Sequence, residues 1–368
     1  MSLVEKTKFT LMNKDERMLD FECFRNIYDE PEFTELCWYV DYRPIGYISL
    51  TSFLERRKAP KHRRHIQELL ERYGCNDLEG FLRVTRALSL NDTFWVRADT
   101  DALCWDEVSL YTNEFNELIS EAAFDGTFSE MGLSSTSPEF GTDGYYAKCW
   151  RRRGGCICLY KSGSALHEIE PLSEFLASQV AAMICPGSVA YDMDRYHGKL
   201  VSICELFTGE SSGLAKASSL FHEEQTVPGL LSYFEAISSG DLFRRMCVLD
   251  ALIYNPDRHY GNFGVMFDTG TMRVIGMAPV FDHNQCLFPE LDNEQLRSPE
   301  YYLNKCKPRL GKNFVLTARN LLTDSIRSDL AVLRDFTFSQ HSAIKAEQER
   351  LDALSMIVRA QVAEILKL

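Results

Sequence analysis

The chain has 368 residues, a formal net charge of −13 at pH 7 and a sequence pI of about 5.2. That length suggests two or three domains or lobes with full cores, and the acidic balance argues against nucleic acid as the main partner. No apolar run is long enough to span a bilayer, MSLVEKTKFT lacks a signal-peptide core, and the twelve cysteines contain no CxxC pair. We therefore expect a soluble protein of a reducing cytosol without a zinc or disulfide framework.

Residues 1–125 are interpreted as a separate module. Helical apolar spacing predicts a helix from Lys14 to Tyr28, and a hairpin is predicted from Leu36 to Leu50. Asn76 or Asp77 is placed to cap a helix ending near Leu88. The apolar run Phe94-Trp95-Val96 is typical of a packed strand.

The most basic segment runs from Arg56 to His65. It would suit nucleic acid, but in so acidic a chain a solvated helix start is favoured. Ile66, Leu69 and Leu70 would form the buried side of the amphipathic helix that continues from it.

From Phe124 to Gly144 the residues become small and polar. Such a stretch can cover phosphates with backbone N–H groups and hydroxyls, although an ordinary surface linker is an equal alternative because GxGxxG and GKS/GKT patterns are absent. The candidate phosphate ligands are Ser134, Ser135 and Ser137.

A hairpin is predicted next, from Tyr145 to Tyr160 with a turn at Gly154-Gly155. It ends in Lys161, which could reach the α and β phosphates of ATP if an acid anchored its ammonium group. The presence of this lysine favours the interpretation of the preceding small and polar stretch as a phosphate-covering loop.

The helix predicted from Pro171 to Ile184 carries the expected anchor, Glu174. Spacing and order support the pair with Lys161, and Glu168 or Glu170 would serve as alternatives.

Strands predicted near 189–192 and 199–207 complete a small sheet. The chain is then expected to cross to a second lobe at 205–208, where a hinge could offer its backbone to an adenine edge. We therefore include Glu205 and Phe207 among the candidate cofactor-binding residues. A polar connector is predicted at 209–219.

Helical apolar spacing nearly all round predicts a buried central helix from Asp241 to Tyr254. It would deliver the polar loop NPDRHYGN, and Asp250 is interpreted as a structural carboxylate that bonds this loop. Helices are also predicted at 317–322 and within 342–366.

The loop and the hairpin that follows it, ending in PVFD, suit phosphoryl transfer. Asp257, Asn262 and Asp282 provide the oxygens that such chemistry needs for a base and a Mg²⁺ site, in the kinase order DxxxxN and then a lone Asp. His259, in the same loop, is a further catalytic candidate. A surface hairpin with incidental polar residues is the alternative interpretation.

With these residues in place, the chain resembles the HipA-like serine/threonine protein kinases, which include HipA toxins and CtkA-type kinases. The resemblance rests on YNPDRHYGNFGVMF, IGMAPVFDHNQCL, LSEFLASQVA and LYK, within about 133–291. It implies an α+β, two-lobed kinase fold with a small β-rich N-lobe and a mainly helical C-lobe, preceded by an extra module. The implied boundaries are 1–125 for an accessory module, 126–209 for the N-lobe and 210–368 for the C-lobe.

The resemblance also implies roles. Asp257 would orient the substrate hydroxyl, Asn262 and Asp282 would hold Mg²⁺, Lys161 would meet the phosphates of ATP, and Glu174 would support Lys161. A serine of the phosphate loop is autophosphorylated in the family, so Ser134, Ser135 and Ser137 are the candidates here. Where the family carries Gly, this chain has Asn284, which is expected to tolerate the left-handed turn.

The implied partners are ATP, a protein substrate and a cognate antitoxin or regulator, in the bacterial cytoplasm with secretion left open. A small-molecule or lipid kinase is one alternative, because phosphoinositide kinases use a similar DRHxxN loop. A nucleotide-binding pseudokinase acting through residues 1–125 is the other, and the complete Asp257, Asn262 and Asp282 set weighs against it.

Overall fold

The structure is a computed structural model that describes residues 6–59, 64–126, 137–142, 144, 146–164 and 168–367. The chain forms two compact units. The first comprises Met1–Leu159, Thr208–Ala215 and Phe267–Arg273, and the second comprises Tyr160–Phe207, Lys216–Met266 and Val274–Leu368. Antiparallel strand pairs and many helices make up the fold, so the predicted mixture of α and β structure is confirmed.

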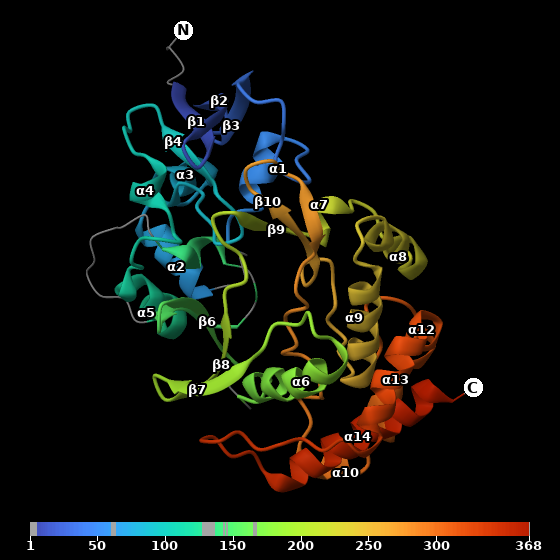
Figure 1. Cartoon of the computed structure of the whole chain (residues 1–368). Helices are drawn as coiled ribbons and strands as arrows, with labels where there is room; N and C mark the ends of the chain where they lie inside the picture. Colours follow the sequence, from blue (N-terminus) through green and yellow to red (C-terminus); the bar gives the residue numbers. More distant parts are fainter. Residues whose placement is uncertain are drawn as a thin grey trace. The chain divides into compact units, whose positions relative to one another are not determined.

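The first unit contains a four-stranded sheet in the order β3-β2-β1-β4 (Figure 1). Its strands are β1 (Lys6–Asn13), β2 (Glu16–Arg25), β3 (Pro31–Trp38) and β4 (Phe94–Ala98). Its helices are α1 (Leu50–Glu55), α2 (Arg64–Arg72), α3 (Leu78–Thr85), α4 (Trp105–Val108), α5 (Glu117–Asp125) and the 3-10 turn η1 (Pro138–Gly141). Strand β5 (Lys148–Arg153) and the start of β6 (Cys156–Ser162) follow, as the predicted hairpin requires.

Two predictions for this unit are wrong. The segment predicted as a helix from Lys14 to Tyr28 is mainly strand β2, in which Leu19, Phe21 and Cys23 are buried in alternation. Several of these apolar residues fit both the alternating pattern of a strand and the spacing of a helix, which is why a helix was predicted. The hairpin predicted from Leu36 to Leu50 is also absent, because β3 ends at Trp38 and the next regular element is α1.

Other features of the first unit are confirmed. Asp77 caps α3 by accepting a hydrogen bond from the Gly80 N–H at 2.8 Å, and the predicted strand at Phe94 is β4. The apolar side of α2 is buried, as its amphipathic pattern predicted. The expected solvation fails at Arg57, whose buried guanidinium forms a two-pronged pair with Asp92 at 2.8 Å on each side.

The second unit is mainly helical and also contains strands of two small sheets. The sheet orders are β5-β6-β8-β7 and β11-β10-β9. The strands are β7 (Asp192–Tyr196), β8 (Lys199–Glu205), β9 (Ser212–Lys216), β10 (Gly264–Asp268) and β11 (Val274–Met277). The helices are α6 (Glu170–Ile184), α7 (Ala217–Leu220), α8 (Val227–Ala236), α9 (Gly240–Leu252), α10 (Asn293–Arg297), α11 (Glu300–Lys305), α12 (Phe314–Leu321), α13 (Asp324–Val332) and α14 (Gln348–Leu366), with the 3-10 turn η2 (Leu333–Asp335).

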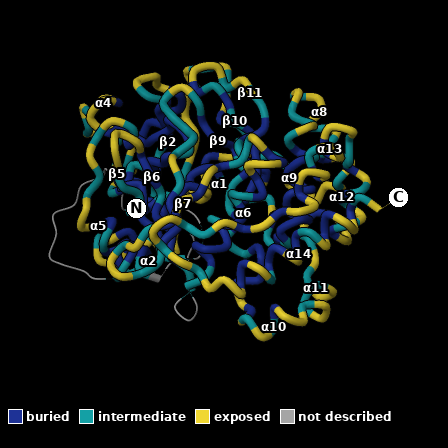
Figure 2. The backbone as a smooth tube through the Cα atoms, turned by 60° about the horizontal axis from the view of Figure 1, so that its bottom comes forward, coloured by how far each residue is buried: buried dark blue, intermediate teal, exposed yellow. Residues whose placement is uncertain are grey.

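Helix α9 lies at the centre of the second unit, packed by α8, α12, α6 and α14. Most of its side chains are buried, which confirms the predicted central helix (Figure 2). The predicted helices around α6, α12 and α14 are also present, although α14 begins at Gln348, after the predicted start. The segment 209–219, predicted as a connector, contains β9 and α7, and β7 lies a few residues later than predicted.

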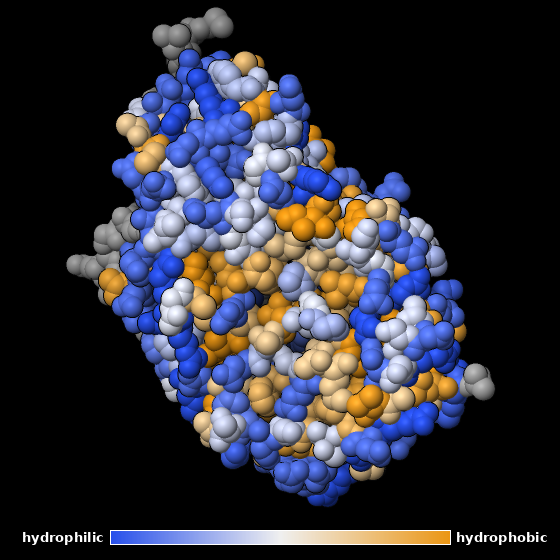
Figure 3. Space-filling view, viewed as in Figure 1, coloured by the Kyte–Doolittle hydropathy of each residue, from blue (hydrophilic) through white to orange (hydrophobic). Residues whose placement is uncertain are grey.

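The surface of the second unit is hydrophilic along the lower rim of Figure 3, where Figure 1 places α10 and α14. Among the described residues, none of the helices has both the length and the apolar character needed to cross a bilayer.

Candidate functional site

Lys161, near the end of β6, bonds two carboxylates of the second unit. Its Nζ lies 2.5 Å from Glu174 Oε1 and 2.7 Å from Asp282 Oδ1. Glu174 Oε2 in turn accepts a hydrogen bond from the Ser202 hydroxyl of β8 at 2.5 Å. The structure thus selects Glu174 over Glu168 and Glu170 as the helix carboxylate that pairs with Lys161.

The elements explain why these groups meet. Pro171 lies in the first turn of α6, and Leu172, Leu176 and Val180 bury one side of that helix. Glu174 is carried on the same helix and is completely buried. Neighbouring strands β6 and β8 bring Lys161 and Ser202 to it.

The ionisation of the pair follows from burial and charge. Burial alone would lower the pKa of Lys161, but the charges of Asp282 and Glu174 outweigh it, so the pKa is raised and the ammonium is kept. Burial raises the pKa of Glu174, and the Lys161 ammonium opposes this shift. The Lys161 ammonium thus lies between two carboxylates, both within hydrogen-bond distance.

Asp282 is held from its backbone by Tyr191. The Asp282 N–H donates to the Tyr191 hydroxyl at 2.9 Å. The two segments run side by side, because Val189 N–H donates to Val280 O at 2.8 Å and Val280 N–H donates to Gly187 O at 2.9 Å. Tyr191 is thus part of the frame that fixes the end of the PVFD segment.

We expect Tyr191→Phe to lower the free energy of unfolding by about 1–3 kcal/mol, because the Asp282 N–H would lose its acceptor. Urea denaturation of both proteins would measure this difference. Tyr233→Phe is the control, since no hydrogen bond of the Tyr233 hydroxyl is found within the described part of the chain. An equal effect of both changes would show that the Tyr191 hydroxyl does not support Asp282.

The loop after α9 is shaped by a left-handed residue and a buried carboxylate. Tyr254 has φ +48°, and the Asn255 N–H donates to Asp250 O at 2.9 Å, a bond that closes the helix end. Asn255 Nδ2 donates to Asp250 Oδ1 at 2.9 Å, and Asn255 Oδ1 accepts from the Asp257 N–H at 3.1 Å. The predicted structural role of Asp250 is confirmed.

Arg258 connects this loop with the segment before Asp282. It is 1% exposed, and its Nε and Nη2 donate to the Asp250 carboxylate at 2.9 and 3.0 Å. Its Nη1 donates to Asn262 O at 2.7 Å and to Phe281 O at 2.5 Å. One guanidinium therefore fixes the backbone beside both Asn262 and Asp282.

Asp257 and Asn262 are held at the two ends of the loop. Asn262 Nδ2 donates to Asp257 O at 3.0 Å, which directs the amide nitrogen back into the loop. Burial raises the pKa of Asp257, and the charge of Asp282 raises it further, while His259 and Arg309 lower it. These carboxylates form a locally acidic site.

His259 lies on the exposed side of the loop. Its Nδ1 accepts from the Gly261 N–H at 2.9 Å, so the ring proton of the neutral form is on Nε2, 3.8 Å from Asp257 Oδ2. That distance is too long for a hydrogen bond. The catalytic role predicted for His259 stays a prediction.

The turn after Asp282 differs from the expectation. Asp282 itself has the left-handed conformation, with φ +62°, whereas Asn284 does not. The tolerance expected of Asn284 is therefore not called upon, because the left-handed residue of this turn is Asp282. Aspartate is one of the few residues other than glycine that adopts this conformation readily.

His283 points into the core instead of toward solvent. It is completely buried, and its Nδ1 lies 3.2 Å from Arg258 Nη2. Burial lowers its pKa well below the ordinary value, and the Arg258 charge lowers it further. A neutral ring with Nδ1 accepting from Arg258 adds another link between the two segments.

The remaining predicted residues lie in other surroundings. Phe207 packs against Phe281 with ring centroids 5.6 Å apart, and Glu205 is exposed at the end of β8. Ser137 is buried in the first unit, and its hydroxyl donates to Glu139 at 2.6 Å. Ser134 and Ser135 lie outside the described residues.

Sequence reasoning missed four residues that support the site: Arg258, Tyr191, Ser202 and His283. Arg258 follows Asp257 directly, and a cation in so polar a loop could have been assigned to the nearby Asp250. Tyr191 lies just before β7 and Ser202 lies in the middle of β8, and no pattern in the sequence distinguishes them.

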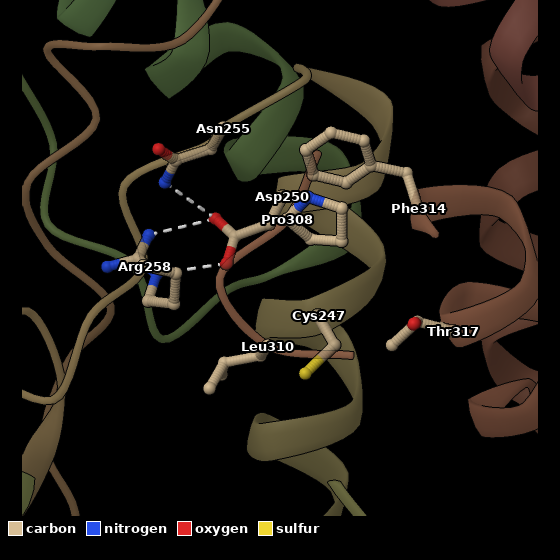
Figure 4. Close-up of a pocket in the computed structure, with 8 residues that line it drawn as sticks. All are labelled: Cys247, Asp250, Asn255, Arg258, Pro308, Leu310, Phe314 and Thr317. Atoms are coloured by element: carbon tan, nitrogen blue, oxygen red, sulfur yellow. Dashed lines mark hydrogen bonds and ion pairs between the residues drawn. The ribbon is translucent and has the colours of Figure 1, made fainter. Parts of the chain in front are cut away.

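A pocket lies behind the loop, on the side of α9 and α12. The empty space in this pocket is about 260 Å³, a volume that includes the part of the pocket that is open to solvent. Figure 4 shows the bonded Asp250, Asn255 and Arg258 on one wall. The other lining residues are Cys247, Pro308, Leu310, Phe314 and Thr317.

The chain matches no family model, and no curated protein matches it. Among solved structures, it is similar to HipA of Shewanella oneidensis MR-1, from a toxin–antitoxin complex with HipB and operator DNA. That similarity covers 97% of each chain, with a TM-score of 0.52 and 11% identity. It is also similar to CtkA, a proinflammatory kinase of Helicobacter pylori, with 59% of this chain and 90% of that chain covered, a TM-score of 0.44 and 17% identity. The expected resemblance is confirmed for the fold, and the HipA similarity extends beyond the predicted range 133–291.

Proposed function

We propose that the chain is a HipA-like serine/threonine protein kinase that transfers the γ-phosphoryl group of ATP to a protein hydroxyl. One observation carries this proposal. Lys161 is bonded to Glu174 and Asp282, while Arg258 ties the Asp257–Asn262 loop to the segment that ends in Asp282. Phosphoryl transfer needs such a positioned cation, base and set of oxygen ligands in one place.

In this proposal Asp257 orients the acceptor hydroxyl and accepts its proton. Lys161 binds phosphate oxygens of ATP, and Glu174 keeps its ammonium group in place. Glu205 and Phe207 lie on the adenine side of a hinge between two lobes, and the phosphate loop supplies Ser134 and Ser135. The modules 1–125, 126–209 and 210–368 retain the roles implied by the resemblance.

The donor set fits Mg²⁺. Asn262 Nδ2 is used inside the loop, so its Oδ1 is the atom that remains for a cation, and Arg258 bonds both Asn262 O and the carbonyl of Phe281, the residue before Asp282. Oxygen ligands of this kind are the ones Mg²⁺ prefers. Burial is the main cause of the raised pKa of Asp257, and the charge of Asp282 adds to it. When bound, Mg²⁺ would neutralise charge on the phosphates of ATP.

The proposal includes a partner that regulates the kinase. The solved HipA comes from a complex with HipB and operator DNA, and its fold similarity spans nearly the whole chain. We therefore infer a cognate antitoxin-like regulator in a bacterial cytoplasm.

The test is incubation of the full chain with γ-labelled ATP and Mg²⁺, followed by electrophoresis and mass spectrometry. We expect label on the chain itself or on an added protein, and we expect EDTA to abolish it. Ser137 is buried and bonded to Glu139, so self-label is expected at Ser134 or Ser135. Label only in a small product would favour a small-molecule or lipid kinase, and ATP binding without any label would favour a pseudokinase.

A further inference from the structure

In one segment of this acidic chain, all the charged residues are basic. From Tyr301 to Thr323 there are five Lys or Arg residues and no Asp or Glu, in a chain whose net charge is −13. The basic residues are Lys305, Lys307, Arg309, Lys312 and Arg319. A local reversal of charge of this kind needs a reason beyond solubility.

The middle of this segment is a loop of fixed shape. Pro308 restricts the backbone, and Gly311 has φ +82°, where a Cβ would lie 2.4 Å from Thr317 Oγ1. Asn313 then caps α12 by accepting a hydrogen bond from the Leu316 N–H at 3.1 Å. Side chains on such a loop start from defined positions, which lowers the entropic cost of binding.

Three cations of the loop are uncommitted. Lys307, Arg309 and Lys312 are exposed, and within the described ranges none of them takes part in an ion pair. The outer two cations differ, because Lys305 bonds the Tyr301 hydroxyl and Arg319 bonds Glu364. Arg319 is thus the one cation of this segment in an ion pair, whereas Lys307, Arg309 and Lys312 have neither an ion pair nor a side-chain hydrogen bond within the described ranges.

This loop packs beside the loop that carries Asp257. The Cys306 thiol lies 3.8 Å from Tyr254 O, just before Asn255. Pro308 and Leu310, which flank Arg309, line the same pocket as Asn255 and Arg258 (Figure 4). Burial raises the pKa of Asp257, and the Arg309 charge is among those that lower it, which places Arg309 within electrostatic range of this carboxylate.

We propose that Lys307, Arg309 and Lys312 form a docking site for acidic residues that flank the acceptor hydroxyl of a protein substrate. The proposal rests on the proposed function and narrows its substrate class. The carboxylates of an acidic substrate segment would be repelled by the Asp257 carboxylate. The charges of Lys307, Arg309 and Lys312 would compensate this repulsion. A nucleic acid is disfavoured as the occupant because a polyanion would meet few cations and a strongly acidic remainder.

The test compares peptides that contain a single serine flanked by aspartates, alanines or lysines. Their affinities for the full chain are measured by the anisotropy of a fluorescent label, and their kcat/KM values are measured with ATP and Mg²⁺. We expect the aspartate peptide to bind about tenfold more tightly than the alanine peptide at low salt, with the difference shrinking as ionic strength rises.

The variant Lys307→Glu/Arg309→Glu is expected to reverse this order and favour the lysine peptide, which a misfolded protein could not do. The control Arg327→Glu/Arg334→Glu makes the same change in net charge at exposed positions of the second unit. It should keep the preference for aspartate.

Equal affinities of the three peptides for the unmodified chain would overturn the docking site. The docking site would also be overturned if Lys307→Glu/Arg309→Glu kept the preference for the aspartate peptide. The same holds if this variant bound all three peptides as before and lost only its affinity for a single-stranded oligonucleotide. Self-labelling from ATP needs no peptide, so its absence would count against the proposed kinase, whereas the binding assay decides the docking site without turnover.

Discussion

Asp257→Asn is expected to reduce phosphoryl transfer about 10²–10⁴-fold, the range for loss of a positioned general base. The amide keeps the size of the side chain, and the loop bonds made by the Asp257 backbone N–H and carbonyl remain. Binding of ATP and Mg²⁺ should therefore persist. Initial rates of label transfer and a nucleotide titration by calorimetry measure the two properties separately.

Asp268→Asn is a suitable comparison. Asp268 is the carboxylate at the turn of the following hairpin and bonds Thr271 and Gly270 there. Its variant should transfer label at nearly the rate of the unmodified chain. Full activity of Asp257→Asn would show that Asp257 is not the general base. The proposed site around Lys161 would then contain no identified base.

The second large effect concerns stability. Asp250→Ala should lower the free energy of unfolding by about 3–5 kcal/mol, because it leaves the buried Arg258 guanidinium without its carboxylate. Asn255 would lose the acceptor of its side-chain amide as well. The midpoint of urea denaturation measures the loss, and activity should fall with it since Arg258 would no longer be anchored.

Asp329→Ala, on α13, provides a contrast, because the partner of Asp329 lies on the same helix as Asp250. Asp329 pairs with Arg245 of α9, but its side chain is 37% exposed, and Arg245 also bonds Asp241 and Ile184 O. We expect a cost below about 1 kcal/mol. A loss at Asp250 as small as the loss at Asp329 would mean that Arg258 finds another arrangement.

The parts of the site that could be predicted are those encoded within a short stretch of chain. Asp250 lies one helix turn before the loop that it bonds, so its role follows from local spacing. Lys161 and Glu174 lie on consecutive elements, and a cation at a strand end needs a carboxylate nearby. In each case the partners are close in sequence, which makes the number of alternatives small.

The missed parts depend on pairings between distant segments. Tyr191 meets Asp282 only because 187–191 and 280–282 run side by side, an arrangement that no local pattern specifies. The strand β2 was missed for a related reason. Its apolar residues satisfy both a helical and an alternating pattern, and pairing with β1 and β3 decides in favour of the strand.

The left-handed backbone of Asp282 affects how this position should be probed. Alanine there would remove the carboxylate and also force an unfavourable φ, so an alanine scan would mix a change of chemistry with a change of fold. Asparagine removes the charge and tolerates the same backbone. By the same reasoning, Asn at 282 would keep the backbone of this turn while leaving Glu174 as the remaining carboxylate of the Lys161 ammonium. An Asn at this position in a related sequence would therefore mark a scaffold that has kept the turn and given up the charge.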